Sequence, residues 1–283
     1  MTDTSLISVA WLRTNIEAPG IRLLDASWHM PATGRDARAE HRTKAIPNAQ
    51  FFDIETVADT DSPLPHTCPT NAQFAHAVTQ LGVRNSDFVV VYDTAGLFSA
   101  PRAWWLFRAF GHQRVAVLDG GLPAWEAAGL PLTSGSAEEP SDTAYSAELD
   151  ETLIARRERV AQAVAEGSAC ILDARSPGRF AGLQPEPRPE LPSGHMAGAH
   201  NVPFASLLDA DGQRLKPREA LREIFADHLP TGAAPVITSC GSGVTACVLA
   251  LALWELGVTA RVYDGSWTEW ASRYPDQIER TES

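Results

Sequence analysis

A cysteine flanked by glycine and hydroxyl residues is the part of this sequence best suited to chemistry. Residues 239–245 read Ser-Cys-Gly-Ser-Gly-Val-Thr, and the cysteine is Cys240. An apolar run at 235–238 is typical of a short buried strand, and the apolar run at 248–256 is typical of a buried helix. Cysteine attacks as the thiolate, which a helix N-terminus stabilises. The pattern therefore predicts a nucleophilic cysteine at a strand-to-helix turn.

The glycines around this cysteine predict a tightly curled loop. Gly241 and Gly243 let the backbone turn so that several N–H groups point at one anionic atom, and the helix dipole adds positive charge there. The alternative is a structural cysteine in the core, which is a common fate of free cysteines. A core cysteine would need neither glycine, so we favour the reactive interpretation.

This loop resembles the active loop of the rhodanese superfamily of sulfurtransferases, and specifically that of the 3-mercaptopyruvate sulfurtransferases. That loop reads Cys-Gly-Ser/Thr-Gly-Val-Thr, as residues 240–245 do here, and the resemblance extends from about Leu24 to Trp270. It implies that Cys240 carries sulfur as a persulfide. It also implies that four further loop residues contact the substrate: Gly241, Gly243, Val244 and Thr245.

The residues after the cysteine bear on the sulfur donor. Thiosulfate enzymes of the superfamily typically have basic residues there, which suits a doubly charged inorganic anion, whereas Gly241 and Ser242 are neutral. The resemblance therefore favours 3-mercaptopyruvate as donor, with thiosulfate as the alternative.

A second cluster, residues 173–189, follows a predicted strand and contains several arginines. Its prolines and glycines predict an irregular loop without a helix, at the sheet edge where ligands of open α/β sheets bind. Arg179 and Arg188 offer paired donors that suit a carboxylate. In the family, two substrate arginines occur in Gly-Arg-Phe and Glu-Pro-Glu-Pro-Arg contexts, and here only Gln184 departs from that pattern.

The alternative for these arginines is an ordinary surface role, with each guanidinium paired to a nearby acid. The candidate acids are Glu186 and Glu190. Arg175, which lies close by, is expected to form a structural ion pair.

A third group of candidate residues is spread over both halves of the chain. In the family, a serine two residues after the cysteine is proposed to join a histidine and an acid in a proton relay. Ser242 matches the serine, His66 the histidine and Glu55 the acid. The family usually has aspartate at the last position, so Glu55 is one methylene longer than the usual acid, and Asp53 is the alternative.

The sequence repeats itself, which predicts two similar domains. Residues 119–125 match residues 264–270 at an offset of 145, whereas Leu24-Asp25-Ala26 matches residues 172–174 at an offset of 148. Carried back without a gap, the first offset places Ala95 opposite Cys240. The first half is therefore expected to lack a nucleophile, and the site is expected in a cleft between the halves.

Each half alternates short apolar runs with helical patterns, which predicts an α/β fold with a parallel sheet and helices on both faces. The resemblance identifies these as two tandem rhodanese-like domains. We expect the first at residues 1–130, a linker at 131–151 and the catalytic domain at 152–283. The expected strands are 21–26, 88–92, 115–118, 170–174, 235–238 and 260–263. The expected helices are 71–81, with Thr70 as N-cap, 99–110, 123–128, 153–166, 217–228, 244–256 and 267–273.

Composition excludes several classes of function. The chain has 283 residues, 44% of them apolar, and a net charge of −12 without basic runs, so a nucleic-acid or anionic-membrane partner is not expected. Four dispersed cysteines argue against a zinc site or a disulfide framework. No targeting peptide or long apolar run is present, so we expect a cytoplasmic protein. No metal or organic cofactor is expected.

The resulting hypothesis is that Cys240 takes sulfur from 3-mercaptopyruvate, releases pyruvate and passes the sulfur to thioredoxin, a small dithiol or cyanide. A cysteine phosphatase would need an arginine closing a Cys-x5-Arg loop, and position 246 is alanine. A non-catalytic binding module is the remaining alternative, and the combination of Cys240 with two arginines argues against it.

Overall fold

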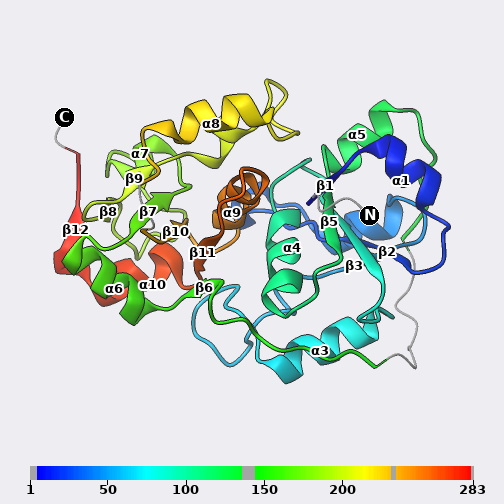
Figure 1. Cartoon of the computed structure of the whole chain (residues 1–283), viewed down its shortest axis with the longest axis horizontal. Helices are drawn as coiled ribbons and strands as arrows, with labels where there is room; N and C mark the ends of the chain where they lie inside the picture. The colour runs from blue at the N-terminus through cyan, green and yellow to red at the C-terminus, as the bar shows by residue number, and fades with distance from the viewer. Residues whose placement is uncertain (1–4, 136–143, 231–233, 282–283) are drawn as a thin grey trace. The chain divides into compact units, whose positions relative to one another are not determined.

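The computed structural model describes residues 5–135, 144–230 and 234–281, and they fall into two compact units. The first unit comprises residues 1–61, 68–150 and 208–215, and the second comprises 62–67, 151–207 and 216–283. Each unit therefore includes a short segment from the other half of the sequence. Figure 1 labels the elements in chain order.

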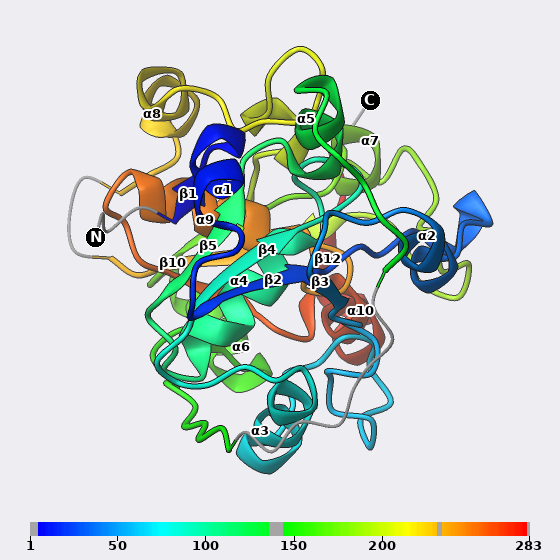
Figure 2. The same cartoon turned by 90° about the vertical axis from the view of Figure 1, so that its right-hand side faces the viewer.

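The first unit contains a five-stranded parallel sheet in the order β1-β5-β4-β2-β3. Its strands are β1 (Leu6–Ile7), β2 (Ile21–Asp25), β3 (Ala49–Phe51), β4 (Phe88–Tyr92) and β5 (Val115–Leu118). Its helices are α1 (Val9–Asn15), α2 (Ala37–Thr43), α3 (Asn71–Gln80), α4 (Ala100–Ala109) and α5 (Gly121–Ala127). Figure 2 shows α1 and α5 on one side of this sheet and α4 and α3 on the other.

The second unit repeats this topology in the order β6-β11-β10-β7-β9, again with parallel pairs. The strands are β6 (Ile154–Ala155), β7 (Cys170–Asp173), β9 (His200–Asn201), β10 (Val236–Ser239) and β11 (Ala260–Tyr263). The helices are α6 (Arg157–Glu166), α7 (Pro177–Phe180), α8 (Arg218–Ala226), α9 (Ala246–Glu255) and α10 (Ser266–Arg273). A separate antiparallel pair joins β8 (His195–Met196) to β12 (Ile278–Glu279).

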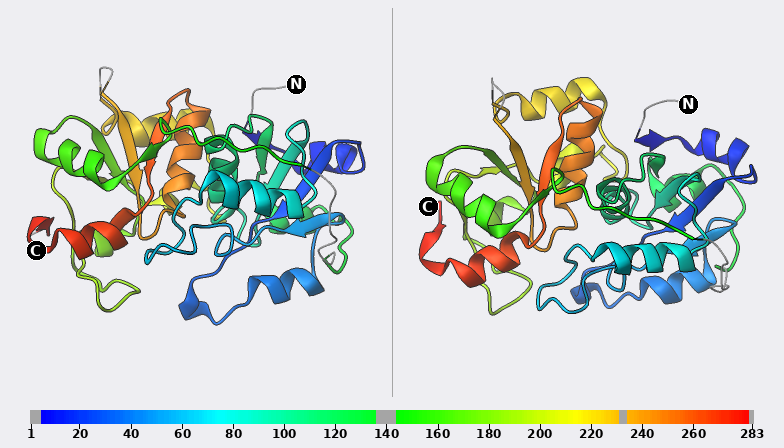
Figure 3. Two further views of the ribbon diagram at one scale, coloured as in Figure 1. Left: turned by 90° about the horizontal axis from the view of Figure 1, so that it is seen from below. Right: turned by 60° about the horizontal axis from the view of Figure 1, so that its bottom comes forward.

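Apolar side chains on both faces of each sheet are covered by helices, as the unbroken apolar strands predict. In the second unit, α6 and α10 pack on one face, where Trp267 and Trp270 are fully buried with Ile171 and Ile237. Helix α9 lies on the opposite face and is apolar over residues 246–253, all of which are buried. Figure 3 shows the green α6 and the orange α9 on opposite sides of the strands. The predicted α/β class with two similar sheets is confirmed.

Two local predictions were wrong. The helix expected from residue 153 begins at Arg157, because Ile154 and Ala155 pair with β11 as strand β6. The loop expected to exclude a helix contains the single turn α7, since Pro177 stands in the first turn, where its missing N–H costs nothing. The expected N-cap is confirmed: Thr70 and Gln73 form a capping box at the start of α3.

The middle of the expected linker, residues 136–143, lies outside the described residues. Thr133 on one side of it forms a β-bridge with Ala45. On the other side, Tyr145 is buried with its ring against Phe74 and stacked on His112. Within the described parts of the chain, no helix is long and apolar enough to cross a membrane.

Candidate active site

Cys240 is the first residue after strand β10, and α9 begins six residues later. The residue is only 2% exposed, and the Gly243 N–H donates to its Sγ at 3.2 Å. Gly243 has φ +83°, a conformation that favours glycine and lets the loop turn back over the sulfur. The local sequence therefore produces the strand–turn–helix arrangement that it predicts.

The first turn of α10 holds the cysteine peptide from the other side. The Cys240 N–H donates to Ser266 Oγ at 3.1 Å, and the Cys240 carbonyl accepts from the Trp267 N–H at 3.0 Å. The Gly241 carbonyl accepts from both the N–H and the hydroxyl of Thr268, at 3.0 and 2.7 Å. Sequence reasoning missed Ser266 and Thr268 as supporting residues, although both lie in the repeated segment 264–270.

His66 meets Ser242 in the second unit. The segment 62–67 belongs to this unit, and His66 Nδ1 lies 3.0 Å from Ser242 Oγ. Both side chains are buried, and His66 has φ +58°, an uncommon conformation for a residue other than glycine. Two of the three expected relay residues, 176 positions apart in sequence, are thus in hydrogen-bond contact.

Glu55, the third expected member, belongs to the first unit. Its Oε1 accepts from the Trp28 indole N–H at 3.0 Å, and both residues line a cavity of about 400 Å³. The alternative acid, Asp53, pairs with Arg38 at 3.0 Å. Trp28 was not predicted, and its segment contains no motif that would have indicated it.

The arginine loop, residues 177–194, is organised around a buried carboxylate. Glu186 pairs through one oxygen with Arg175 at 2.8 Å and through the other with Arg179 at 2.5 Å. Arg175 is also bound to Asp173, and its side chain is fully buried. Burial lowers the pKa of Arg175, but the Asp173 and Glu186 carboxylates outweigh this effect and raise it above the usual value. The expected structural pair of Arg175 is confirmed.

Both candidate substrate arginines lie beside the cysteine loop. A Cβ added to Gly241 would lie 3.1 Å from Arg179 Nη2, which explains why a side chain would be crowded at that position. Arg188 Nη1 lies 3.5 Å from the hydroxyl of Thr268, which itself donates to the Gly241 carbonyl. Arg179 also has the local acidic partner, Glu186, that the alternative interpretation expected.

Strand register corrects the expected pairing of Ala95 with Cys240. Leu24 pairs with Val91 as Leu172 pairs with Thr238, so the residue after β4, Asp93, stands where Cys240 stands after β10. The hydrogen bonds agree, since the Asp93 carbonyl accepts from Leu122 as the Cys240 carbonyl accepts from Trp267.

The ungapped offset failed because each connection around the helix is one residue longer in the first half. Residues 93–99 separate β4 from α4, whereas 240–245 separate β10 from α9. Residues 110–114 separate α4 from β5, whereas 256–259 separate α9 from β11. At the position of Cys240 the first half therefore has aspartate, and not the expected alanine.

The Asp93 carboxylate accepts hydrogen bonds from several backbone N–H groups. One oxygen accepts from Ala95 at 2.9 Å, and the other accepts from Phe98, Ser99 and Ala100 at 2.8 to 2.9 Å. We call this set of converging N–H groups the amide cradle. In the first unit the cradle therefore holds one negative charge supplied by the chain itself.

Helix α9 begins at Ala246, as α4 begins at Ala100. The N–H groups of Val244, Thr245 and Ala246 in the second unit therefore correspond to those of Phe98, Ser99 and Ala100 in the first. Among the residues that the structure describes, none of these three N–H groups donates to a protein acceptor. The second cradle is therefore available to an anion.

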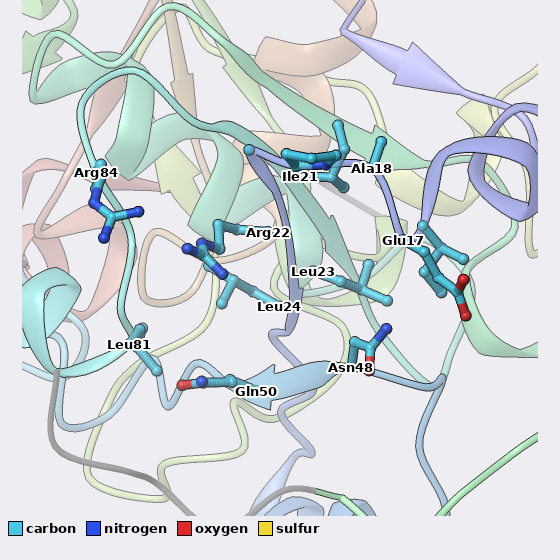
Figure 4. Close-up of a pocket in the computed structure, with 13 residues that line it drawn as sticks. Glu17, Ala18, Ile21, Arg22, Leu23, Leu24, Asn48, Gln50, Leu81 and Arg84 are labelled. Atoms are coloured by element: carbon cyan, nitrogen blue, oxygen red, sulfur yellow. The ribbon is translucent and has the colours of Figure 1, made fainter.

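A further cavity of about 400 Å³ lies in the first unit, away from these loops. Figure 4 shows Ile21, Asn48 and Arg84 among its lining residues. Ile21 begins β2 and Asn48 precedes β3, so the cavity lies at the amino ends of the strands, opposite the edge where Asp93 follows β4. In the described ranges, no group of three or more His, Cys, Asp or Glu residues could hold a metal ion.

Comparison with known families identifies the fold. The family model for the rhodanese-like domain matches residues 8–128 and 156–273, which together make up most of the chain. The protein belongs to the rhodanese-like family. Each matched segment contains four of the five strands of one sheet, so the family's domain occurs here twice.

Full-length relatives of this rhodanese-like protein are sulfurtransferases. The human protein named 3-mercaptopyruvate sulfurtransferase is 41% identical over 95% of this chain and 92% of its own length. The rat protein named thiosulfate sulfurtransferase is 42% identical, over 96% of this chain and 94% of its own. The Escherichia coli structure SseA, described as a 3-mercaptopyruvate sulfotransferase, is 39% identical with a TM-score of 0.84, covering 93% of this chain and 99% of that one.

Cys170, which lies in the second unit outside the cysteine loop, should react slowly. Burial raises the pKa of the Cys170 thiol to about 11, so at pH 8 only about one molecule in a thousand carries the thiolate that alkylating reagents attack. We expect iodoacetamide to label native Cys170 roughly a hundredfold more slowly than the urea-unfolded chain at pH 8, and the difference to shrink as the pH approaches 11. Peptide mapping of alkylation rates measures this, and equal rates at pH 8 would contradict it.

Proposed function

We propose that the protein is a sulfurtransferase that takes sulfur from 3-mercaptopyruvate, carries it as a Cys240 persulfide, releases pyruvate and passes the sulfur to a thiol or to cyanide. The observation on which the proposal chiefly rests is the cysteine loop itself. It combines a nucleophile, an amide cradle open to an anion and two neighbouring arginines.

The arginines support an α-keto acid as donor. Arg179 lies against Gly241, and Arg188 reaches the same peptide through Thr268, so two guanidinium groups approach the position next to the nucleophile. A guanidinium presents fixed, paired donors that match a carboxylate, and the second can bind the adjacent keto oxygen. Bound in this way, the donor would place its thiol carbon and sulfur toward Cys240.

The reaction needs one bond to form, one to break and one proton to move. The Cys240 thiolate attacks the donor sulfur, and the carbon–sulfur bond breaks with its electron pair moving to carbon, which gives the enolate of pyruvate. The thiol proton of the donor is transferred to that carbon. Ser242 and His66, in contact at 3.0 Å, are the groups we assign to this transfer. Glu55 completes the proposed relay on the ground of its Phe-Phe-Asp-Ile-Glu context.

The first unit supports the assignment of the cradle to the persulfide. The outer sulfur of a cysteine persulfide and a carboxylate oxygen of aspartate are both two bonds from Cβ, and each species carries one negative charge. Asp93 places its oxygen on three successive N–H groups. By this correspondence, the N–H groups of Val244, Thr245 and Ala246 would bind the outer sulfur of the Cys240 persulfide.

Thiosulfate is the second candidate donor, since relatives with both names are similarly identical to this chain. The neutral Gly241 and Ser242 favour mercaptopyruvate. A phosphatase is disfavoured because position 246, where a Cys-x5-Arg loop would place its arginine, is a buried alanine.

The acceptor and the compartment are also parts of the proposal. We assign as acceptor a nucleophile that attacks the outer sulfur of the persulfide: the thiolate of thioredoxin or of a small dithiol, or cyanide. No disulfide joins any of the four cysteines in the structure, and thiols stay reduced in a reducing compartment. The cytoplasm is our first assignment, and an organelle is the alternative because one relative from Arabidopsis thaliana is named mitochondrial.

A comparison of donors tests the function directly. We expect kcat/KM for 3-mercaptopyruvate to exceed that for thiosulfate by at least tenfold, because the carboxylate and keto oxygen engage both arginines while the loop offers thiosulfate no basic side chain. Steady-state kinetics with cyanide as acceptor measures the ratio. A ratio below one would replace mercaptopyruvate by thiosulfate, and no turnover with either donor would refute the sulfurtransferase assignment.

Removing either guanidinium should weaken donor binding. A hydrogen bond to a charged group contributes about 1.5–3 kcal/mol, so Arg179→Gln or Arg188→Gln should raise KM for mercaptopyruvate about tenfold or more. Arg222→Gln is the control, because Arg222 pairs with Glu219 on the exposed surface of α8. Unchanged KM in both site variants would exclude these arginines from donor binding.

A further inference from the structure

The last described residues of the chain are attached to the arginine loop. Strand β12 pairs antiparallel with β8, with Ile278 opposite Met196 and Glu279 opposite His195. Strand β8 immediately follows the arginine loop. Ile278 also packs against the core cluster that contains Trp267 and Trp270, so β12 joins this loop to the core of the second unit.

Two hydrogen bonds extend this attachment to both ends of the loop. The Thr281 N–H donates to the Ala181 carbonyl at 3.1 Å, two residues after Arg179. Arg280 Nε donates to the Ser193 carbonyl at 3.3 Å. The next residue, Gly194, donates its own N–H to the Arg179 carbonyl at 3.1 Å. One of these bonds therefore reaches the backbone two residues after Arg179. The other reaches the residue before Gly194, whose N–H binds the Arg179 carbonyl.

Two glycines show how closely the segments approach. Gly194 has φ +134°, and a Cβ there would lie 2.5 Å from the Glu279 carbonyl oxygen. Gly182 has φ +80°, and a Cβ there would lie 2.7 Å from Arg280 Cγ. Backbone oxygen cannot move aside as a flexible side chain can, so the contact at Gly194 requires glycine.

His195 provides a second connection from β8 to the turn that carries Arg179. Its ring stacks on Phe180 at 4.0 Å between centroids, and its Nδ1 lies 2.9 Å from the Phe180 carbonyl oxygen. Phe180 is adjacent to Arg179. Displacing β8 would therefore move helix α7 as well.

We propose that residues 278–281 form a C-terminal clamp that positions Arg179 for binding of the anionic sulfur donor. The clamp residues are positioning residues, since none of them is placed in contact with the donor. The expected change in KM for mercaptopyruvate rests on the proposed function. The structural part of the inference, restraint of the loop, does not depend on which donor the protein uses.

The peptide N–H of Thr281 allows a matched test in the full chain. Thr281→Pro removes that N–H, whereas Thr281→Ala keeps it and removes only the exposed side chain. The proline variant should raise KM for mercaptopyruvate about three- to tenfold with kcat within twofold of wild type. The alanine variant should stay within 1.5-fold of wild type for both constants.

Two readouts separate positioning from general damage. The rate at which cyanide removes sulfur from persulfide-loaded enzyme should be unchanged in the proline variant, because the amide cradle does not depend on the arginines. Amide hydrogen exchange of residues 178–194, measured by mass spectrometry without donor, should be faster in the proline variant than in the alanine variant.

Each outcome decides between these possibilities. Unchanged hydrogen exchange, or an unchanged KM, would overturn the clamp. A parallel loss of donor turnover and cyanide reactivity would also overturn it, since that pattern indicates damage to the cysteine loop. A wild-type protein that fails to turn over mercaptopyruvate would refute the proposed donor, and the exchange measurement would still decide whether the clamp restrains the loop.

Discussion

Convergence of backbone N–H groups on one negatively charged atom after the middle strand is the interaction on which the site depends. The first unit builds it after β4, and the second unit has the corresponding strand–loop–helix connection after β10. In the first unit Asp93 occupies it, and its carboxylate accepts four N–H groups. In the second unit a cysteine stands there instead. One architecture thus holds a fixed structural anion in the first half and, in our proposal, would bind a reactive anion in the second.

Buried ion pairs fix the positions of the arginines around the cysteine loop. Arg175, fully buried, is bound by Asp173 and Glu186, and its Nη2 also donates to the Gly194 carbonyl at 2.7 Å. Glu186 also pairs with Arg179 and so fixes the position of its guanidinium, although the Arg179 side chain remains partly exposed. A buried ion pair contributes little net stability, but removing one partner is costly, so such a network favours a single arrangement of the loop. The loop that presents the arginines is therefore held from inside by charge and from outside by β12.

The sequence predicted the parts of the molecule whose signals are local. Strands β4, β5 and β11 have the predicted bounds, because each is apolar, apart from Arg261 in β11, and is bounded at both ends by polar residues. The turn at Cys240 followed from glycine and apolar patterning. The contact of His66 with Ser242 came from a family resemblance, since no property of two residues so far apart in sequence indicates that they meet.

What the sequence did not predict depends on register and on distant packing. Single-residue differences in two connections hid the correspondence of Asp93 with Cys240. Edge strands of two or three residues, such as β6 and β12, are too short for a periodic pattern. Thr268 is a common polar residue whose role appears only when α10 is placed beside Cys240. Glu186 was expected only as a local partner of the surface arginines, whereas it also binds the buried Arg175.

The most direct test of the account is the mass of the intact protein after incubation with 3-mercaptopyruvate, followed by peptide mapping. The account predicts a gain of one sulfur atom per chain, located on Cys240 and absent from the Cys240→Ser variant. The first unit should gain none, because its cradle holds the Asp93 carboxylate. No gain in the wild type, or a gain on Cys68, Cys170 or Cys247 that persists in Cys240→Ser, would contradict it.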